Sequence, residues 1–183
     1  MPRIADLDTA RMSPEQARIH DAIVAGPRGL VEGPLRVWLT SPGLAATAQE
    51  LGAFCRFGTS LSPRLSELAI LITGAFWRAG FEWAVHAPIA VKAGISPEVA
   101  EAIRTGSTPN FAREDEAVVH DFCTALHHDH VVEPETYARA IATLGEKGVV
   151  ELVGILGYYT LISMTINAFE VPLPNGAADP FPN

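Results

Sequence analysis

Apolar residues recur along most of this chain at spacings of three and four, which is the period of a helix with one buried face. The first such segment carries Ala17, Ile19, Ile23 and Val24 as its apolar set. No segment alternates apolar and polar residues as a half-buried strand does. We therefore expect an all-α bundle of about seven helices. The pattern predicts helical segments at residues 14–25, 42–57, 63–78, 81–93, 97–105, 113–128, 134–144 and 148–169.

Several of these segments begin with the same dipeptide. Ser-Pro occurs four times, starting at Ser13, Ser41, Ser62 and Ser96. Serine is a good N-cap, and proline at the first helical position loses no hydrogen bond because its N–H would be unpaired there anyway. Gln16 follows Ser13 at the spacing of a capping box. The repeated start signal supports the all-helical prediction.

The segments between the predicted helices outline the domain. A Gly-Pro-Arg-Gly break after residue 25 ends the first helix, and residues 30–40 read as an irregular connection. We expect its apolar residues to fold over the core or a pocket; they are Pro34, Leu35, Val37 and Trp38. We predict a single domain over residues 1–183, with an N-terminal extension over about 1–40 and an acidic, proline-rich surface arm over 170–183.

The composition indicates a subunit that hides part of its surface. Hydrophobic residues make up 48% of the 183 residues and charged residues only 19%, which favours oligomerisation. The net charge of −8 without a basic run argues against a nucleic-acid partner. The N-terminus lacks the apolar core of a signal peptide, and Cys55 and Cys123 form no disulfide framework. We therefore expect a cytoplasmic protein.

Three proton-handling side chains stand out in the apolar stretch from Pro63 to Gly94. Glu82 and His86 are four residues apart, so on a helix they lie on one face, one turn from each other. A carboxylate at that spacing can fix the tautomer of an imidazole and raise its basicity. Glu67 lies within an apolar run and is expected to be at least partly buried. Pro88 falls in the same predicted helix as the pair, and it either bends that helix around a packed neighbour or helps present the pair to a cavity.

The sequence Glu82-Trp83-Ala84-Val85-His86 and the following HAPIAVKAGIS carry a family resemblance. Over about Leu51–Gly106 the chain resembles the carboxymuconolactone decarboxylase and alkylhydroperoxidase D superfamily, and it does so more loosely over the rest of the C-terminal half. The peroxidase branch carries Glu, then Cys-x-x-Cys, then His. Counted back from His86, these positions hold Glu67, Ala79 and Glu82, so both redox cysteines are absent. The decarboxylase branch carries Glu-x-x-x-His, which this chain matches.

The resemblance implies an alkylhydroperoxidase D-like helical fold and a cofactor-free acid–base lyase, similar to 4-carboxymuconolactone decarboxylase, acting on a small organic acid or lactone. In that reaction His86 would move the proton at the substrate carbon, Glu82 would orient and tune His86, and Glu67 would supply or relay a second proton.

The resemblance also implies substrate-binding groups and an assembly. Decarboxylation leaves an enolate that needs nearby hydrogen-bond donors, and the candidates are Trp83, Arg64 and Arg78. Relatives in this superfamily form trimers and hexamers, so we expect a homotrimer or homohexamer with a small-molecule substrate.

Two alternatives stay open. A peroxidase needs a thiolate and a resolving thiol, and Ala79 and Glu82 occupy the matching positions. A binding or scaffold oligomer would keep the fold with an idle Glu–His pair. In that case Glu67 would serve as a structural partner for Arg64 or Arg78.

Two further stretches suggest a metal site and a membrane span, and we disfavour both interpretations. The cluster His127-His128-Asp129-His130 suggests a metal, but histidine near a helix C-terminus already interacts favourably with the helix dipole, so we expect no metal site there. Residues 152–169 carry no charge over a length that could span a membrane, yet Gly, Thr, Ser and Asn dilute them. We expect a buried helix at a subunit interface and no membrane span, with Tyr158 and Asn167 either lining a pocket or hydrogen-bonded in the core.

Overall fold

The computed structural model describes residues 2–5 and 7–182, and the regular structure in that part of the chain is helical. Two short 3-10 helices, η1 (Thr9–Arg11) and η2 (Pro174–Gly176), lie near the two ends. The α-helices are α1 (Pro14–Ala25), α2 (Pro34–Trp38), α3 (Pro42–Phe57), α4 (Pro63–Phe76), α5 (Gly80–Ala93), α6 (Pro97–Thr105), α7 (Glu114–His128) and α8 (Pro134–Phe169). The all-α prediction is confirmed.

Three of the four Ser-Pro starts cap their helices as predicted. Ser13 and Gln16 form a full capping box, in which Ser13 N–H donates to Gln16 Oε1 at 2.8 Å and Gln16 N–H donates to Ser13 Oγ at 3.2 Å. Ser62 Oγ accepts from the Leu65 N–H and Ser96 Oγ accepts from the Val99 N–H. Ser41 makes no side-chain cap, although its helix also starts at the following proline.

The connection predicted to be irregular contains a short helix. Gly33 adopts φ +53°, a conformation open to glycine, and Pro34 then begins the five-residue α2. Leu35 and Trp38, three residues apart, lie buried on the core side of this helix. The apolar residues of this segment therefore fold onto the core, and the single turn is too short for a periodic pattern to reveal.

The two helices predicted over 134–144 and 148–169 form one long element with an internal kink. Gly145 has φ +71° and ψ 167°, which is not helical, so α8 changes direction there. After the kink, the helix buries Leu152, Ile155 and Tyr159. Among the described residues, α8 is long and apolar enough to cross a membrane, but 61% of its most apolar window is buried inside the protein, as in the core helix of many proteins.

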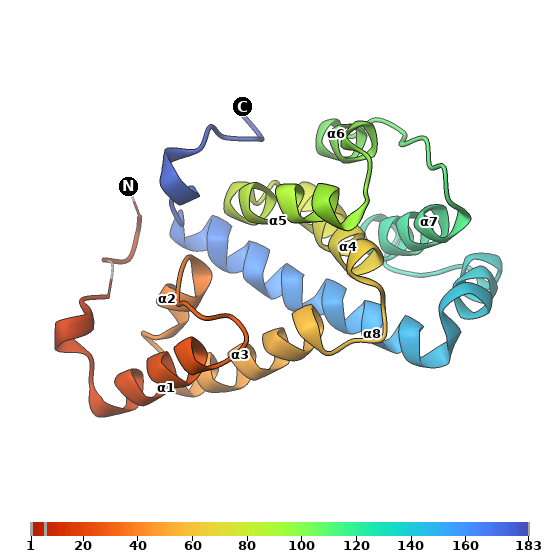
Figure 1. Cartoon of the computed structure of the whole chain (residues 1–183). Coiled ribbons are helices and arrows are strands. Elements are labelled where there is room, and N and C mark those ends of the chain that lie inside the picture. Colours follow the sequence, from red (N-terminus) through yellow and green to blue (C-terminus); the bar gives the residue numbers. More distant parts are fainter. Residues whose placement is uncertain (1, 6, 183) are drawn as a thin grey trace.

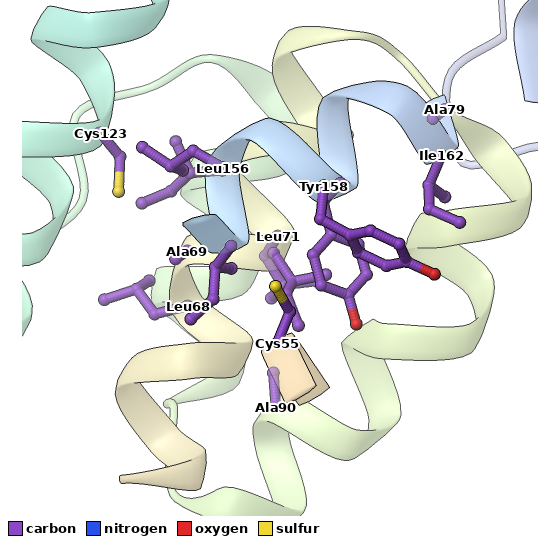
Figure 2. Packing of buried hydrophobic residues seen from close by; sticks show 14 of the residues in the cluster. Cys55, Leu68, Ala69, Leu71, Ala79, Ala90, Cys123, Leu156, Tyr158 and Ile162 are labelled. Atoms are coloured by element: carbon purple, nitrogen blue, oxygen red, sulfur yellow. The ribbon is translucent and has the colours of Figure 1, made fainter. Parts of the chain in front are cut away.

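The helix α8 crosses the centre of the molecule (Figure 1), with α4 and α5 packed on one side of it and α2 and α3 on the other. Helix α1 packs against α3. The most enclosed element is α4, in which every residue from Leu65 to Gly74 is buried. Figure 2 shows Leu68, Ala69 and Leu71 of α4 close to Tyr158 and Leu156 of α8. A helix that is apolar on all sides is expected at this central position.

The C-terminal arm lies on the surface and is anchored near its end, at Pro180 and Phe181. Phe181 is buried against Trp83, with ring centroids 5.5 Å apart. Arg78 Nη2 donates to the backbone carbonyl of Phe181, and Arg104 Nη1 donates to that of Pro180. The arm is thereby fixed across α5 and α6.

Candidate active site

The tight connection between α4 and α5 brings the three predicted acid–base residues together. Glu67 lies in the second turn of α4, whereas Glu82 and His86 lie in successive turns of α5, which packs against α4. Gly74 of α4 faces the Glu82 side chain, which a Cβ at Gly74 would meet at an ordinary contact distance of 3.7 Å. Each of the three residues is at most 6% exposed.

His86 contacts a carboxylate through each ring nitrogen. Its Nδ1 is 2.7 Å from Glu67 Oε2, in a hydrogen bond, and its Nε2 is 3.0 Å from Glu82 Oε1. The second contact is an ion pair whose geometry falls short of a hydrogen bond, so among the described residues Glu82 Oε1 is buried without a hydrogen-bond partner. The imidazole is thus held by a hydrogen bond to Glu67 and by an ion pair with Glu82.

The two carboxylates decide the charge of His86. Burial alone opposes the imidazolium, but the adjacent charge of Glu82 and the hydrogen bond to Glu67 outweigh it and raise the pKa of His86 to about 9. The ring is therefore positively charged at neutral pH. A charged imidazole that lies between two carboxylates can act as a general acid.

A cavity of about 140 Å³ opens beside this triad. Glu82 and His86 line it, whereas Glu67 lies behind them and does not. The Tyr159 ring meets the His86 ring edge to face, with centroids 5.3 Å apart. The other walls come from α2, α3, α8 and the segment before α2, and they include Pro34, Leu35, Arg28, Arg56 and Tyr158.

Two arginines at this cavity were not among the predicted site residues. Arg28 sits in the Gly-Pro-Arg-Gly break after α1, where the sequence signals only the end of a helix. Arg56 lies in the last turn of α3, where a basic residue is ordinary. Tyr158 lines the cavity, which is one of its two predicted positions. Asn167 is exposed and donates to the Trp77 carbonyl, so the prediction that it lines a pocket or lies in the core is wrong. No local pattern links Arg28, Arg56 and Tyr158, because they meet only when the segment after α1 packs with α3 and α8.

The predicted substrate-binding residues Trp83, Arg64 and Arg78 do not line this cavity. Arg64 binds Asp115 and Glu116 at the start of α7, at 2.6 Å and 2.5 Å, and so ties α4 to α7. Arg78 and Trp83 hold the C-terminal arm. Neither arginine pairs with Glu67, whose partner is His86.

Of the histidine cluster, His127 and His128 line a separate cavity of about 540 Å³ between α4, α6 and α7. His127 Nε2 contacts Thr73 Oγ1 at 3.0 Å, and its ring stacks on Phe76. Burial and the neighbouring His128 lower the pKa of His127 to about 4. Among the described residues, no group of three or more His, Cys, Asp or Glu side chains is placed to hold a metal ion.

Both cysteines are buried, free thiols. Burial raises the pKa of Cys55 to about 11 and raises that of Cys123 further. Figure 2 shows the two sulfur atoms well apart, with Cys55 near Tyr158 and Cys123 on α7. Neither thiol is activated as a thiolate at neutral pH.

Comparison with solved structures identifies the fold. The chain is similar over 100% of its length to the alkylhydroperoxidase AhpD core of an uncharacterized peroxidase-related protein from Ralstonia eutropha JMP134, with a TM-score of 0.75, 12% identity and 98% of that chain covered. It is similar over 93% to an uncharacterized peroxidase-related protein from Silicibacter sp. TM1040, with a TM-score of 0.73, 14% identity and 91% covered. It is similar over 94% to the debrominase Bmp8 in complex with 2,3,4-tribromopyrrole, with a TM-score of 0.74, 14% identity and 92% covered.

These similarities confirm the predicted AhpD-like helical fold. No protein-family model matches the sequence, and no curated protein sequence matches it significantly. At identities of 12–14% the neighbours establish the fold and leave the activity to be argued from the site.

Proposed function

We propose that this protein catalyses acid–base chemistry at carbon on a small organic acid or lactone, as a lyase resembling 4-carboxymuconolactone decarboxylase. The observation that carries the proposal is the charged imidazole of His86, fixed between two buried carboxylates at the wall of a cavity. Buried groups with strongly perturbed protonation next to a cavity are typical of acid–base sites.

The geometry supports a division of roles among the three residues that differs from the one expected from sequence. Glu67 makes the shorter contact to His86 and lies away from the cavity, so we assign it to orienting the ring. Glu82 and His86 line the cavity and are the groups that would meet substrate. Glu82 Oε1 is paired with His86 Nε2 at 3.0 Å, so we assign Glu82 to stabilising the imidazolium at the cavity wall.

The proposed reaction balances with these groups alone. The bond between the substrate carbon and its carboxylate breaks, its electron pair stays on the substrate as an enolate, and carbon dioxide leaves. The His86 imidazolium donates its Nε2 proton to that carbon, and the neutral ring takes a proton back from solvent. The adjacent Glu82 carboxylate stabilises the imidazolium before and after transfer.

Two other functions receive less support. A dithiol peroxidase is disfavoured because Ala79 and Glu82 stand at the cysteine positions and both thiols are buried and protonated. A purely binding oligomer would not require a charged histidine between two buried carboxylates, since burying three ionisable groups is costly.

The test is turnover of carboxylated lactones, followed by release of carbon dioxide and by incorporation of solvent deuterium at the product carbon. Replacing His86 by Gln should lower kcat by roughly 10²–10⁴-fold, and Glu82→Gln should lower it less. Glu98→Gln, on the exposed face of α6, is the matched control and should leave kcat unchanged. Turnover that survives His86→Gln at the wild-type rate would refute the proposal.

A further inference from the structure

The segment that follows α1 places one arginine over the triad cavity. Arg28, which is half-buried, lines this cavity together with Glu82 and His86. Its Nη2 donates to Tyr158 Oη at 3.0 Å. Its Nε–H is buried and has no hydrogen-bond partner among the described residues. Buried guanidinium donors are almost always satisfied, so an unused one calls for an explanation.

The backbone of α3 packs directly against this arginine–tyrosine pair. A Cβ added at Gly52 would lie 2.0 Å from Tyr158 Oη and 2.3 Å from Arg28 Nη2. Only glycine therefore allows the pair to sit against α3. Burial raises the pKa of Tyr158 to about 12, so its hydroxyl stays protonated while it accepts from Arg28. Arg28 is thus held in one position by groups from α3 and α8.

The charges around the cavity nearly cancel, so recognition of a ligand depends on a direct contact with Arg28. The lining residues include three cations, Arg28, Arg56 and protonated His86, against the two carboxylates of Glu32 and Glu82. Glu67, which lies behind His86, offsets this excess of positive charge. The cavity therefore has no large net electrostatic field that would favour an anion. Recognition must then come from short-range hydrogen bonds, which guanidinium groups form well with carboxylates.

One donor beside the cavity has no hydrogen-bond partner in the described part of the chain. Arg28 Nε–H is a donor that a ligand carboxylate would satisfy, whereas Glu82 Oε1 is already paired with the His86 ring at 3.0 Å. We propose that Arg28, positioned by Tyr158 and Gly52, is the residue that binds the carboxylate of a small organic anion in this cavity. The inference deepens the proposed function and rests on it for the reaction, but the binding role can be tested without turnover.

The experiment measures binding of paraconate, a five-membered lactone bearing one carboxylate, and of its neutral amide, by calorimetric titration of the full-length protein. Wild type should bind the acid about tenfold or more tightly than the amide, since hydrogen bonds to charged groups are stronger than neutral ones. Arg28→Gln should abolish that preference by weakening the binding of the acid and not that of the amide. The matched control is Arg18→Gln, on the exposed face of α1, which should bind both ligands as wild type does.

Two further variants distinguish the loss of Arg28 positioning from a general defect in folding. Tyr158→Phe removes the hydroxyl that holds Arg28, and Gly52→Ala places a Cβ against both side chains, so each should reduce the preference for acid over amide. A variant that merely disturbs the fold would weaken the binding of both ligands equally and would have a lower melting temperature. Equal affinity for acid and amide in wild type, no saturable binding of either, or an unchanged preference in Arg28→Gln would overturn the proposal. Acid-specific binding that persists in His86→Gln without turnover would establish the Arg28 role independently of the reaction.

Discussion

His86 is a buried cation whose charge depends on carboxylates from two helices. Glu82 comes from the preceding turn of α5 and Glu67 from α4, so neither helix alone would create the site. The i,i+4 spacing of Glu82 and His86 was readable from the sequence, because helical geometry fixes that pair. The approach of Glu67 to the other ring nitrogen depended on how α4 and α5 pack, which spacing along the chain does not encode.

Protein stability should fall as pH rises from about 6.5 to about 9. His86 has a folded-state pKa of about 9 against an ordinary value of 6.5, so the folded state binds its proton more tightly. That stabilisation is fully present below pH 6.5 and is lost as pH rises through 9. Urea unfolding across this range should show the decline in wild type and a flatter profile in His86→Gln. A wild-type free energy of unfolding that is constant or increases across this range would contradict the charged-histidine account.

The cysteines should be dispensable for chemistry. Both thiols are buried, and burial raises the pKa of Cys55 to about 11. A stopped-flow assay with an organic hydroperoxide and a dithiol reductant should show no turnover, and Cys55→Ser combined with Cys123→Ser should leave any lyase activity per folded molecule intact. Peroxide turnover that disappears in the double variant would instead establish thiol chemistry.

At the scale of elements, the segment from residue 26 to α2 forms one wall of the site. Gly33 turns the chain at φ +53°, and the Phe81 ring packs directly over it, so that a Cβ would lie 2.3 Å from the ring. Phe81 is itself a cavity residue. The starts of α1, α4 and α6 were predictable because Ser-Pro caps are local. In contrast, α2 was missed because one turn stabilised by tertiary burial leaves no periodic signal.

Gly33→Ala should destabilise the protein more than Gly29→Ala. Both glycines have positive φ, which costs an alanine roughly 1–2 kcal/mol. Only Gly33 also meets a ring, and overpacking adds about 1–3 kcal/mol, whereas a Cβ at Gly29 meets nothing within 4 Å. Urea unfolding of the two variants measures the difference. Equal losses would show that Phe81 moves aside freely and that this wall is not fixed.

At the scale of the whole molecule, α3 and α8 share an outward apolar surface. Leu51 and Phe54 of α3 and Val150 and Val153 of α8 are exposed, with Val150 exposed by 71%. Three of them line a shallow cavity of about 500 Å³ with Gly154. A charge-free run at residues 152–169 was visible in the sequence, but burial of one of its faces and exposure of the other follow only from packing.

We propose that this surface is covered by further copies of the chain in a homotrimer or homohexamer. Analytical ultracentrifugation without detergent should show the assembly, and Val150→Glu should shift it toward monomer because it places a charge in an apolar contact. The matched control is Val131→Glu, because Val131 is 55% exposed in the loop before α8. This variant should leave the assembly unchanged. A wild-type monomer, or a protein recovered only with detergent, would contradict the proposal.

The central claim is that His86 is held as a cation by Glu67 and Glu82, and its pKa measures this most directly. NMR titration of ring-labelled histidine, assigned with His86→Gln, should give a wild-type pKa of about 9 for His86. Glu82→Gln removes the adjacent charge with little change of volume, so the pKa should fall, and a fall of one unit corresponds to about 1.4 kcal/mol of lost interaction. A wild-type value at or below the ordinary 6.5, or a value that does not change in Glu82→Gln, would contradict the account.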